Sequence, residues 1–343
     1  MKFKIFVLFS FLLVTSITAQ DKALHPVESS VLTVKPVSVI DYANTISQDD
    51  LKKLVYELAS DKYEGRKTGE NGQKLAASFL EDYYRERGIS GAFKGGNFLQ
   101  IIPESYFRGR SKDSASNVIA FIKGTSKPDE YIVLSAHYDH VGVRGGKIYN
   151  GADDDASGTS AVLEIAEAFK KAADAGNGPK RSLVFLHVSG EEIGLFGSKF
   201  YTENPVFSLE NTVANLNIDM IGRVDRAHKN NPEFVYLIGA DKISKELYEV
   251  SEAVNKKYVN LQLDYTYNDK DDPNRFYYRS DHYNFAKNGI PIIFYFNGVH
   301  EDYHKPSDTP DKIRYDLLQK RTQLIFYTAW ELANRKNRLK IDK

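Results

Sequence analysis

The sequence of 343 residues contains no cysteine. This absence excludes a fold held together by disulfide bonds, and it excludes a lipid attached to an N-terminal cysteine. The chain must therefore be held together by its apolar core or by bound metal. Its length is compatible with one large α/β domain or two smaller ones. Because no linker rich in proline, glycine and serine interrupts it, we expect a single domain over residues 20–343.

The chain also has no formal net charge, because its 46 lysines and arginines balance its 46 aspartates and glutamates. Removal of an N-terminal segment containing Lys2 and Lys4 would leave 44 basic against 46 acidic side chains, a net charge of −2. A nucleic-acid partner requires a basic face, so none is expected. No later apolar run is long enough to cross a bilayer of about 30 Å, so no stable membrane insertion is expected once that segment is removed.

Residues 1–19 have the pattern of a secretory signal peptide. Lys2 and Lys4 form a short basic start, residues 5–14 are apolar, and residues 16–19 are mostly small or polar, with Ala19 as the expected last residue removed. An uncleaved membrane anchor is the alternative, but the apolar run is too short to span a bilayer of about 30 Å comfortably. The pattern therefore predicts an exported protein that is periplasmic or secreted.

The rest of the chain alternates between short apolar runs and helical patterns. Residues 20–45 lack periodicity, and we expect them to form an extended lead-in. Strands are expected at residues 117–122, 131–136, 182–189, 213–219, 234–239 and 291–296. Helices are expected after the N-cap Ser47, from about Asn71 to Gly88, and at residues 157–172, 194–202, 243–258, 280–288 and 315–336. This alternation is typical of an α/β fold with a mostly parallel central sheet and helices on both faces.

Acids and a histidine follow three of the expected strands. His137 and Asp139 come after the second strand, Glu191 and Glu192 follow the third, and Asp219 closes the fourth. Open α/β sheets bind ligands in the crevice beyond the carboxyl ends of their strands. We therefore expect these side chains to meet at one edge of the sheet.

A glycine-rich loop contains three consecutive aspartates, Asp153, Asp154 and Asp155. One of them is expected to cap the helix that starts near Ser157, but a single cap does not explain three acids. The three would repel one another unless a cation lay among them. Imidazole and carboxylate without thiolate are the ligands of a hydrolytic zinc site. We expect one aspartate to bridge two metal ions, and the spacing does not say which.

The histidines near the first motif offer two candidate ligands. His137 and Asp139 point the same way from the strand end, so Asp139 is expected to accept a hydrogen bond from the far ring nitrogen of a metal-binding His137. His140 is the competing ligand, and spacing alone does not exclude it.

The two adjacent glutamates suggest a division of labour. Glu191 and Glu192 follow a strand, so their side chains should diverge, one binding metal and the other acting as a general base for a water molecule. Tyr303 and His304 lie in a polar loop before the last helix, where a histidine is commonly just a surface residue. Neither carries much weight alone.

The order of these motifs resembles one known family. The His-x-Asp motif at residues 137–139 is followed along the chain by GADDDASG, EEIGLFGS, DM and YH. In combination they are similar to metallopeptidase family 28 of clan MH, the co-catalytic zinc aminopeptidases, whose relatives include glutamate carboxypeptidase and the glutaminyl cyclases. The resemblance covers about residues 131–313 and implies the three-layer zinc-aminopeptidase fold, here as one zinc peptidase domain.

The resemblance also implies a role for each position. Two Zn²⁺ ions would be bound by His137, Asp154, Glu192, Asp219 and His304, with Asp154 as the bridging carboxylate. The other implied roles are Glu191 as general base, Asp139 as the residue that orients His137, and Tyr303 as a donor to the transition-state oxyanion. A cis peptide bond is implied between Asp154 and Asp155. Because all five ligand positions carry the family's residue types, a non-catalytic homologue is not expected.

The implied activity is that of a di-zinc exopeptidase that hydrolyses N-terminal residues from peptide substrates with a free N-terminus. The alternatives are a carboxypeptidase, a glutaminyl cyclase or a non-catalytic metal-binding module. A carboxypeptidase would need an arginine cluster, for which Arg223, Arg275 and Arg279 are candidates. The pocket walls are expected from residues 223–232 and 264–283. The sequence leaves the oligomeric state open.

Overall fold

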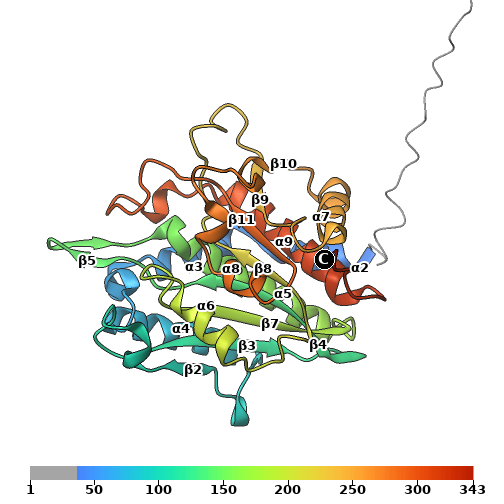
Figure 1. Ribbon diagram of the computed structural model, residues 1–343, viewed down its shortest axis with the longest axis horizontal. Coiled ribbons are helices and arrows are strands. Elements are labelled where there is room, and N and C mark those ends of the chain that lie inside the picture. The colour runs from blue at the N-terminus through green and yellow to red at the C-terminus, as the bar shows by residue number, and fades with distance from the viewer. Residues whose placement is uncertain (1–36, 343) are drawn as a thin grey trace, which may run out of the picture.

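The computed structural model describes residues 37–342, in which a nine-stranded sheet is covered by helices on both faces (Figure 1). The predicted signal peptide lies outside these residues. The strands are β1 (Ser90–Gly91), β2 (Leu99–Ile102), β3 (Ala115–Ile122), β4 (Lys127–His137), β5 (Gly142–Arg144), β6 (Lys147–Tyr149), β7 (Arg181–Val188), β8 (Thr212–Ile218), β9 (Phe234–Ile238), β10 (Gln262–Asp264) and β11 (Ile292–Phe296). The helices are α2 (Val37–Ala43), α3 (Gln48–Leu58), α4 (Asn71–Glu86), α5 (Gly158–Asp174), α6 (Phe196–Glu203), α7 (Lys245–Tyr258), α8 (His282–Ala286) and α9 (Tyr315–Asn334).

The centre of the sheet is parallel. Its strand order is β1-β3-β7-β4-β8-β11-β9-β10, and β2 also pairs with β3. The neighbours β7, β4, β8 and β11 run parallel, whereas β3 is antiparallel to β7 and β9 is antiparallel to β11. The predicted fold class is therefore confirmed, and the parallel pairing is concentrated in the middle of the sheet. As a result, four carboxyl strand ends lie side by side at one edge.

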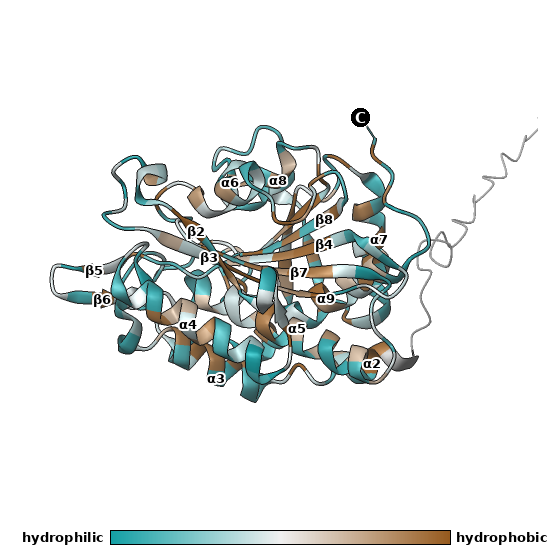
Figure 2. Ribbon diagram, turned by 90° about the horizontal axis from the view of Figure 1, so that it is seen from below, coloured by the Kyte–Doolittle hydropathy of each residue, from teal (hydrophilic) through white to brown (hydrophobic). Residues whose placement is uncertain are grey.

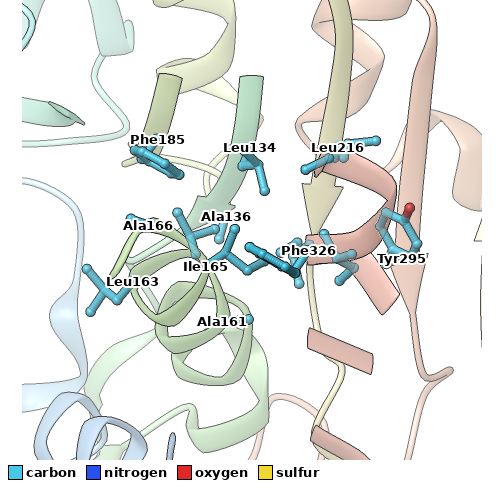
Figure 3. Packing of buried hydrophobic residues seen from close by; sticks show 14 of the residues in the cluster. Leu134, Ala136, Ala161, Leu163, Ile165, Ala166, Phe185, Leu216, Tyr295 and Phe326 are labelled. Atoms are coloured by element: carbon cyan, nitrogen blue, oxygen red, sulfur yellow. The ribbon is translucent and has the colours of Figure 1, made fainter. Parts of the chain in front are cut away.

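Helices pack on the two faces of the sheet in separate layers. Figure 2 shows α2, α3, α4, α5 and α9 on one side of the sheet and α6 and α8 on the other. Successive residues of a strand pack alternately against the two helix layers, because side chains along a strand point to opposite faces of the sheet with a period of two. Leu134 and Phe185 face α5 and α9, where Figure 3 shows them near Ile165 and Phe326.

The neighbouring strand residues point to the other layer. Val133 and Val184 belong to the cluster that contains Tyr201 of α6 and Phe285 of α8. These side chains are fully buried, and each contributes roughly 1.5–3 kcal/mol of hydrophobic free energy relative to exposure. Burial on both faces explains why the central strands read as continuous apolar runs.

The prediction of an extended lead-in through residue 45 is wrong from residue 37 onward, where α2 begins. Val39 and Ala43 are four residues apart, so they share one helical face and both are buried. Tyr42 stacks on Trp330 of α9 with 5.7 Å between ring centroids. Packing of this two-turn segment against α9 stabilises the helix, because a helix this short is marginal in isolation.

Short edge elements were not expected from the sequence. These are β1, β2, β10 and the β5–β6 hairpin, whose strands are two to four residues long. The longer elements were predicted to within a few residues, including the N-cap Ser47, whose side chain accepts from the backbone N–H of Asp50. None of the helices in the described part of the chain combines the length and apolar character required to cross a lipid bilayer.

A buried arginine joins the loops that follow β4 and β6. Arg66 is fully buried at the end of a 3₁₀ turn, Asp61–Arg66. Its guanidinium donates to the backbone carbonyls of Leu58, Tyr138, Asn150 and Gly151 at 2.6–2.9 Å. Four carbonyls in different directions suit the rigid fork of arginine and no other side chain. Arg66 therefore fixes the backbone just before the acid-rich loop and ties it to the loop that follows β4.

Replacing Arg66 by lysine should lower the free energy of unfolding by about 3 kcal/mol, because several buried carbonyls lose their donor and each costs about 1–3 kcal/mol. Urea unfolding of the two proteins measures this difference. The matched control Arg144→Lys, on the exposed β5–β6 hairpin, should change stability by less than about 0.5 kcal/mol. Equal stabilities of Arg66→Lys and the control would show that the hydrogen bonds from Arg66 to these carbonyls do not stabilise the fold.

A second buried group makes stability depend on pH. The imidazole of His187, on β7, is fully buried, and its Nε2 lies 2.7 Å from the hydroxyl of Tyr84. Burial lowers the pKa of His187 to about 3. The unfolded chain therefore binds more protons than the folded one below the ordinary pKa of about 6.5, so stability falls as the pH drops from that value toward 3.

Between pH 7 and pH 5, His187 should account for a loss of about 2 kcal/mol of stability. In His187→Gln this contribution is absent, so the stability of the variant should fall by about 2 kcal/mol less over the same interval. Denaturant unfolding at both pH values, in the presence of a chelator, isolates the effect from metal binding. Identical pH profiles for the two proteins would show that His187 is not held neutral by the fold.

Candidate metal centre

Five segments deliver the predicted site residues to one place. His137 is the last residue of β4, Asp219 follows β8, and Glu191 and Glu192 follow β7. Tyr303 and His304 lie in the loop that leaves β11, and the three aspartates lie in the turn Ala152–Ser157 between β6 and α5. Because β7, β4, β8 and β11 are adjacent and parallel, their carboxyl ends bring these residues to a common edge, as the sequence predicts.

The three consecutive aspartates have different partners. Asp153 accepts from the backbone N–H of Gly222 at 2.6 Å. Asp155 accepts from the N–H groups of Gly158 and Met220 at 2.9 and 3.0 Å, so it caps the start of α5 and also anchors the segment after β8. The peptide bond between Asp154 and Asp155 is cis, as the resemblance implies. The other carboxylate oxygen of Asp153 lies 3.1 Å from Nε2 of His300. Asp154 is therefore the acid of the three whose side chain faces both His137 and His304.

The Asp154 carboxylate lies between two imidazole rings. Its Oδ1 is 3.1 Å from Nε2 of His137, and its Oδ2 is 3.0 Å from Nε2 of His304. His137 Nε2 also lies 3.6 Å from a carboxylate oxygen of Asp219, and His304 Nε2 lies 3.1 Å from one of Glu192. The structure therefore brings all five predicted ligands together in two groups that share Asp154.

The His137 ring shows why a cation fits here. Its Nδ1 is 3.0 Å from the backbone carbonyl of Asp139, which can only accept, so in a neutral ring Nδ1 carries the proton. Nε2 then presents a lone pair to Asp154 and Asp219, whose carboxylates also only accept. Nε2 of His137, Oδ2 of Asp154 and Oε1 of Glu192 are buried, and none of them makes a well-aligned hydrogen bond with the described residues. A cation among these atoms would satisfy them all.

The pKa values of both histidines reflect the same concentration of acids. Burial opposes the protonation of His137, yet Asp154 and Asp219 raise its pKa well above the ordinary value. Burial likewise opposes protonation of His304, and Asp154 and Glu192 raise its pKa to about 10. In the absence of metal, protons would therefore take the place of cations between these rings and carboxylates.

Two further residues compete for the ligand positions. Ligand atoms of His137, Asp155 and Asp219 lie within 4.8 Å of one another, and so do those of His140, Asp154 and Glu192. His140 Nδ1 is 2.6 Å from Oε1 of Glu192. The ligand set given by the resemblance thus stays a prediction, with His140 and Asp155 as alternatives to His304 and Asp154.

Asp139 holds a different position from the one expected. Its carboxylate is 3.8 Å from Nδ1 of His137, and the backbone carbonyl of Asp139 accepts the hydrogen bond instead. The carboxylate accepts from the Thr68 hydroxyl at 2.7 Å and from the backbone N–H of Glu191 at 3.2 Å. Asp139 therefore orients His137 through its main chain, while its side chain ties the β4 loop to the β7 loop.

Glu191 and Tyr303 face the open side of the centre. The Glu191 carboxyl makes no hydrogen bond or ion pair with the described residues. Burial, together with the nearby acids Asp219 and Glu192, raises the pKa of Glu191 well above its ordinary value, and a bound cation would lower it again. Tyr303 stacks on His304 with 3.9 Å between ring centroids. Burial raises the pKa of its hydroxyl, which therefore stays protonated as a donor.

A half-open pocket, the inner pocket, adjoins Asp154, Glu191 and Tyr303, with an empty volume of about 360 Å³ that includes its open mouth. The apolar side chains Met220, Phe276, Phe294, Phe296 and Val299 form one wall. Of the expected walls, the segment 264–283 supplies Phe276 and Arg279, while Tyr267 packs in the core against Tyr236. Phe294 and Phe296 were missed because their strand reads as ordinary core.

A model of peptidase family M28 matches residues 117–329, more than half of the chain. Among curated relatives, a probable zinc metalloprotease from Pyricularia oryzae is 25% identical over 301 residues, covering 74% of this chain and 58% of that protein. A probable leucine aminopeptidase from Arthroderma otae is 26% identical over 329 residues, covering 90% of this chain and 83% of that protein. The chain thus spans little more than half the length of the first relative.

Solved structures share the fold. The LapA aminopeptidase from Legionella pneumophila has a TM-score of 0.69 at 20% identity, with 96% of this chain and 81% of that chain covered. A glutaminyl cyclase from Porphyromonas gingivalis has a TM-score of 0.65 at 18% identity, with 82% and 97% covered. These likenesses concern the fold alone.

The family match covers the whole of the segment in which the motifs resemble family 28, and it confirms that resemblance. The enzyme class predicted from the motifs is the one that the relatives' names carry, a zinc metalloprotease or aminopeptidase. The chain therefore belongs to peptidase family M28.

Proposed function

We propose that the protein is a zinc-dependent aminopeptidase with two metal positions. The observation that carries this proposal is the Asp154 carboxylate, whose two oxygens lie 3.1 and 3.0 Å from the ring nitrogens of His137 and His304. His137 and Asp219 would hold one ion, Glu192 and His304 the other, and Asp154 both. Nitrogen and carboxylate ligands without thiolate suit Zn²⁺ at a catalytic site.

Bound zinc lowers the pKa of a water molecule and polarises a carbonyl group. Glu191 is the proposed general base. Its carboxylate takes the proton of the attacking water and returns it to the leaving amine, which the absence of any hydrogen bond to this carboxylate allows. Tyr303 donates its hydroxyl proton in a hydrogen bond to the developing oxyanion, and one well-placed donor of this kind contributes roughly 3–4 kcal/mol.

The small inner pocket suits the side chain of a single N-terminal residue. Its wall of Met220, Phe276, Phe294 and Phe296 favours an apolar side chain. The same pocket is lined by Asp154, Glu191 and Asp219, so the free amino group of a substrate whose side chain fills it would lie beside the metal centre. A peptide with a free, apolar N-terminal residue is therefore the proposed substrate.

The rival activities predict different products. A glutaminyl cyclase shares the fold and would form pyroglutamate from an N-terminal glutamine. A carboxypeptidase would cleave N-blocked peptides and would need an arginine cluster. Arg223 forms an ion pair with Asp302 at 3.0 Å, and Arg275 stacks over Tyr278. Of the three candidate arginines, only Arg279 lines the pocket. Cleavage of free but not N-blocked aminoacyl anilides, without pyroglutamate formation, would support the aminopeptidase.

Export and a single zinc peptidase domain over residues 20–343 remain proposals. Export rests on the signal-peptide pattern of residues 1–19, outside the described part of the chain. N-terminal sequencing of protein recovered from the periplasm or medium, beginning at Gln20, would support it.

Glu191→Gln keeps the size of the side chain but removes its basicity. We expect kcat to fall at least about a hundredfold, the low end of the contribution of a general base, with zinc content unchanged. Rates on an aminoacyl anilide and metal analysis of the same samples measure both. Glu210→Gln, at an exposed position in the connection between α6 and β8, is the matched control. Wild-type activity in Glu191→Gln would assign the base elsewhere.

The proposed ligand set predicts metal stoichiometry. Wild type should bind two zinc ions per chain, Asp219→Ala and His304→Ala about one each, and Asp154→Ala close to none, because Asp154 serves both positions. Atomic absorption after dialysis measures the content, and circular dichroism shows that each variant is folded. If His140→Gln rather than His304→Ala lost an ion, His140 would be the ligand in that position.

A further inference from the structure

A second hollow meets the inner pocket at Glu191, Tyr303 and His304. It is an open groove with an empty volume of about 990 Å³, and one side is formed by the loop that follows β7, at residues 192–195. Arg110 and Arg279 also line it, and Arg279 lines both hollows. Since the reacting bond must lie beside Glu191, a substrate would place one residue in the inner pocket and the remainder in this groove.

Away from the metal centre, the charged side chains along the groove are all positive. Apart from Glu191, Glu192 and His304 of the metal centre, the charged side chains that line it are Arg110 and Arg279. Both are exposed, and neither forms an ion pair with a carboxylate of the described residues. Two guanidinium groups on one groove without an acidic partner leave a place for an anionic group of the ligand.

Arg110 is held in position from one side. Its Nη1 donates to the backbone carbonyl of Ile193 at 2.6 Å, so it lies against the loop that carries Glu191 and Glu192. Gly194 makes this contact possible, because its φ is +123° and a Cβ there would lie 2.8 Å from that nitrogen. Nε and Nη2 of Arg110 donate to no described residue.

Arg279 is held by a ring rather than by a hydrogen bond. Its guanidinium lies over the Phe276 ring, 4.8 Å from the centroid, and Phe276 belongs to the wall of the inner pocket. Its side chain donates no hydrogen bond to the described residues. The Arg110 guanidinium also lies 5.8 Å from the centroid of the Phe196 ring. Both arginines are therefore positioned by few contacts and keep donors for a planar, doubly accepting partner, which a carboxylate is.

We propose that Arg110 and Arg279 bind a carboxylate on the leaving fragment of the substrate. The preferred substrates are then dipeptides and other very short peptides, whose terminal carboxylate reaches the groove, or peptides with an acidic residue directly after the cleaved bond. This inference rests on the proposed aminopeptidase function and specifies its substrate class.

Three substrates separate the sources of the carboxylate: leucyl-glycine, leucyl-glycinamide and leucyl-aspartic acid amide. We expect kcat/KM of the wild type to be about ten- to a hundredfold higher for leucyl-glycine than for leucyl-glycinamide, the usual effect of a hydrogen bond to a charged group. A similar advantage for the aspartyl compound would show that a side-chain carboxylate is also accepted. Equal rates on all three would overturn the proposal.

The arginine variants test which residues cause the preference. In Arg110→Gln and Arg279→Gln the ratio of kcat/KM for leucyl-glycine over leucyl-glycinamide should fall at least severalfold. The matched control Arg144→Gln, on the exposed β5–β6 hairpin, should keep the wild-type ratio. Wild-type ratios in both groove variants would overturn the proposal.

Binding to the Glu191→Gln variant provides a readout that does not depend on turnover. Zinc-loaded Glu191→Gln should bind leucyl-glycine more tightly than leucyl-glycinamide by calorimetry, and addition of Arg279→Gln should reduce the difference. A wild type that cleaves no peptide with a free amino group would contradict the proposed function, while this binding comparison would still decide the role of the arginines. Equal affinities for the two dipeptides would reject it.

Discussion

The structure depends on the burial of several carboxylates within reach of one another. Ligand atoms of Asp154 and Glu192 lie within 4.8 Å of each other, and the residues Asp154 and Asp219 are only 3% and 8% exposed. At this separation two like charges repel by about 3–4 kcal/mol in a protein environment. A hydrogen bond contributes about 1 kcal/mol, so backbone donors alone do not offset several such pairs. The histidines that face these acids, and the cations that we propose between them, are what make the arrangement stable.

The fold supplies the remaining support through the main chain. Asp153 and Asp155 hold the turn around Asp154 to the segment after β8, and Asp308 accepts from the backbone N–H groups of Asp153 and Asp154 at 3.0–3.1 Å. Arg66 fixes the carbonyls of Asn150 and Gly151, directly before that turn. The four adjacent parallel strands set the spacing of the segments, and their hydrogen-bonded register limits how far any one can move. The positions of the proposed ligands are therefore fixed by the sheet edge and its backbone hydrogen bonds as well as by contacts among the ligands themselves.

The sequence predicted those parts of the protein whose signal is local. Buried strands read as apolar runs, and acids directly after them marked the edge, so His137, Glu192 and Asp219 could be placed together before the structure was known. Features that depend on long-range packing could not be predicted in this way. Phe294 and Phe296 have the pattern of core residues and gain their place in the pocket wall from the position of β11. Arg66, Asp308 and α2 carry no local pattern that distinguishes them, and the carbonyl of Asp139 replaced the carboxylate expected beside His137.

Crystals of the zinc-loaded protein, measured on either side of the zinc absorption edge, would test the central claim most directly. The account predicts two anomalous peaks per chain, roughly 3.5–4 Å apart, one on the His137 side and one on the His304 side of the Asp154 carboxylate. A single peak distant from Asp154, or none in crystals shown by elemental analysis to contain zinc, would contradict it.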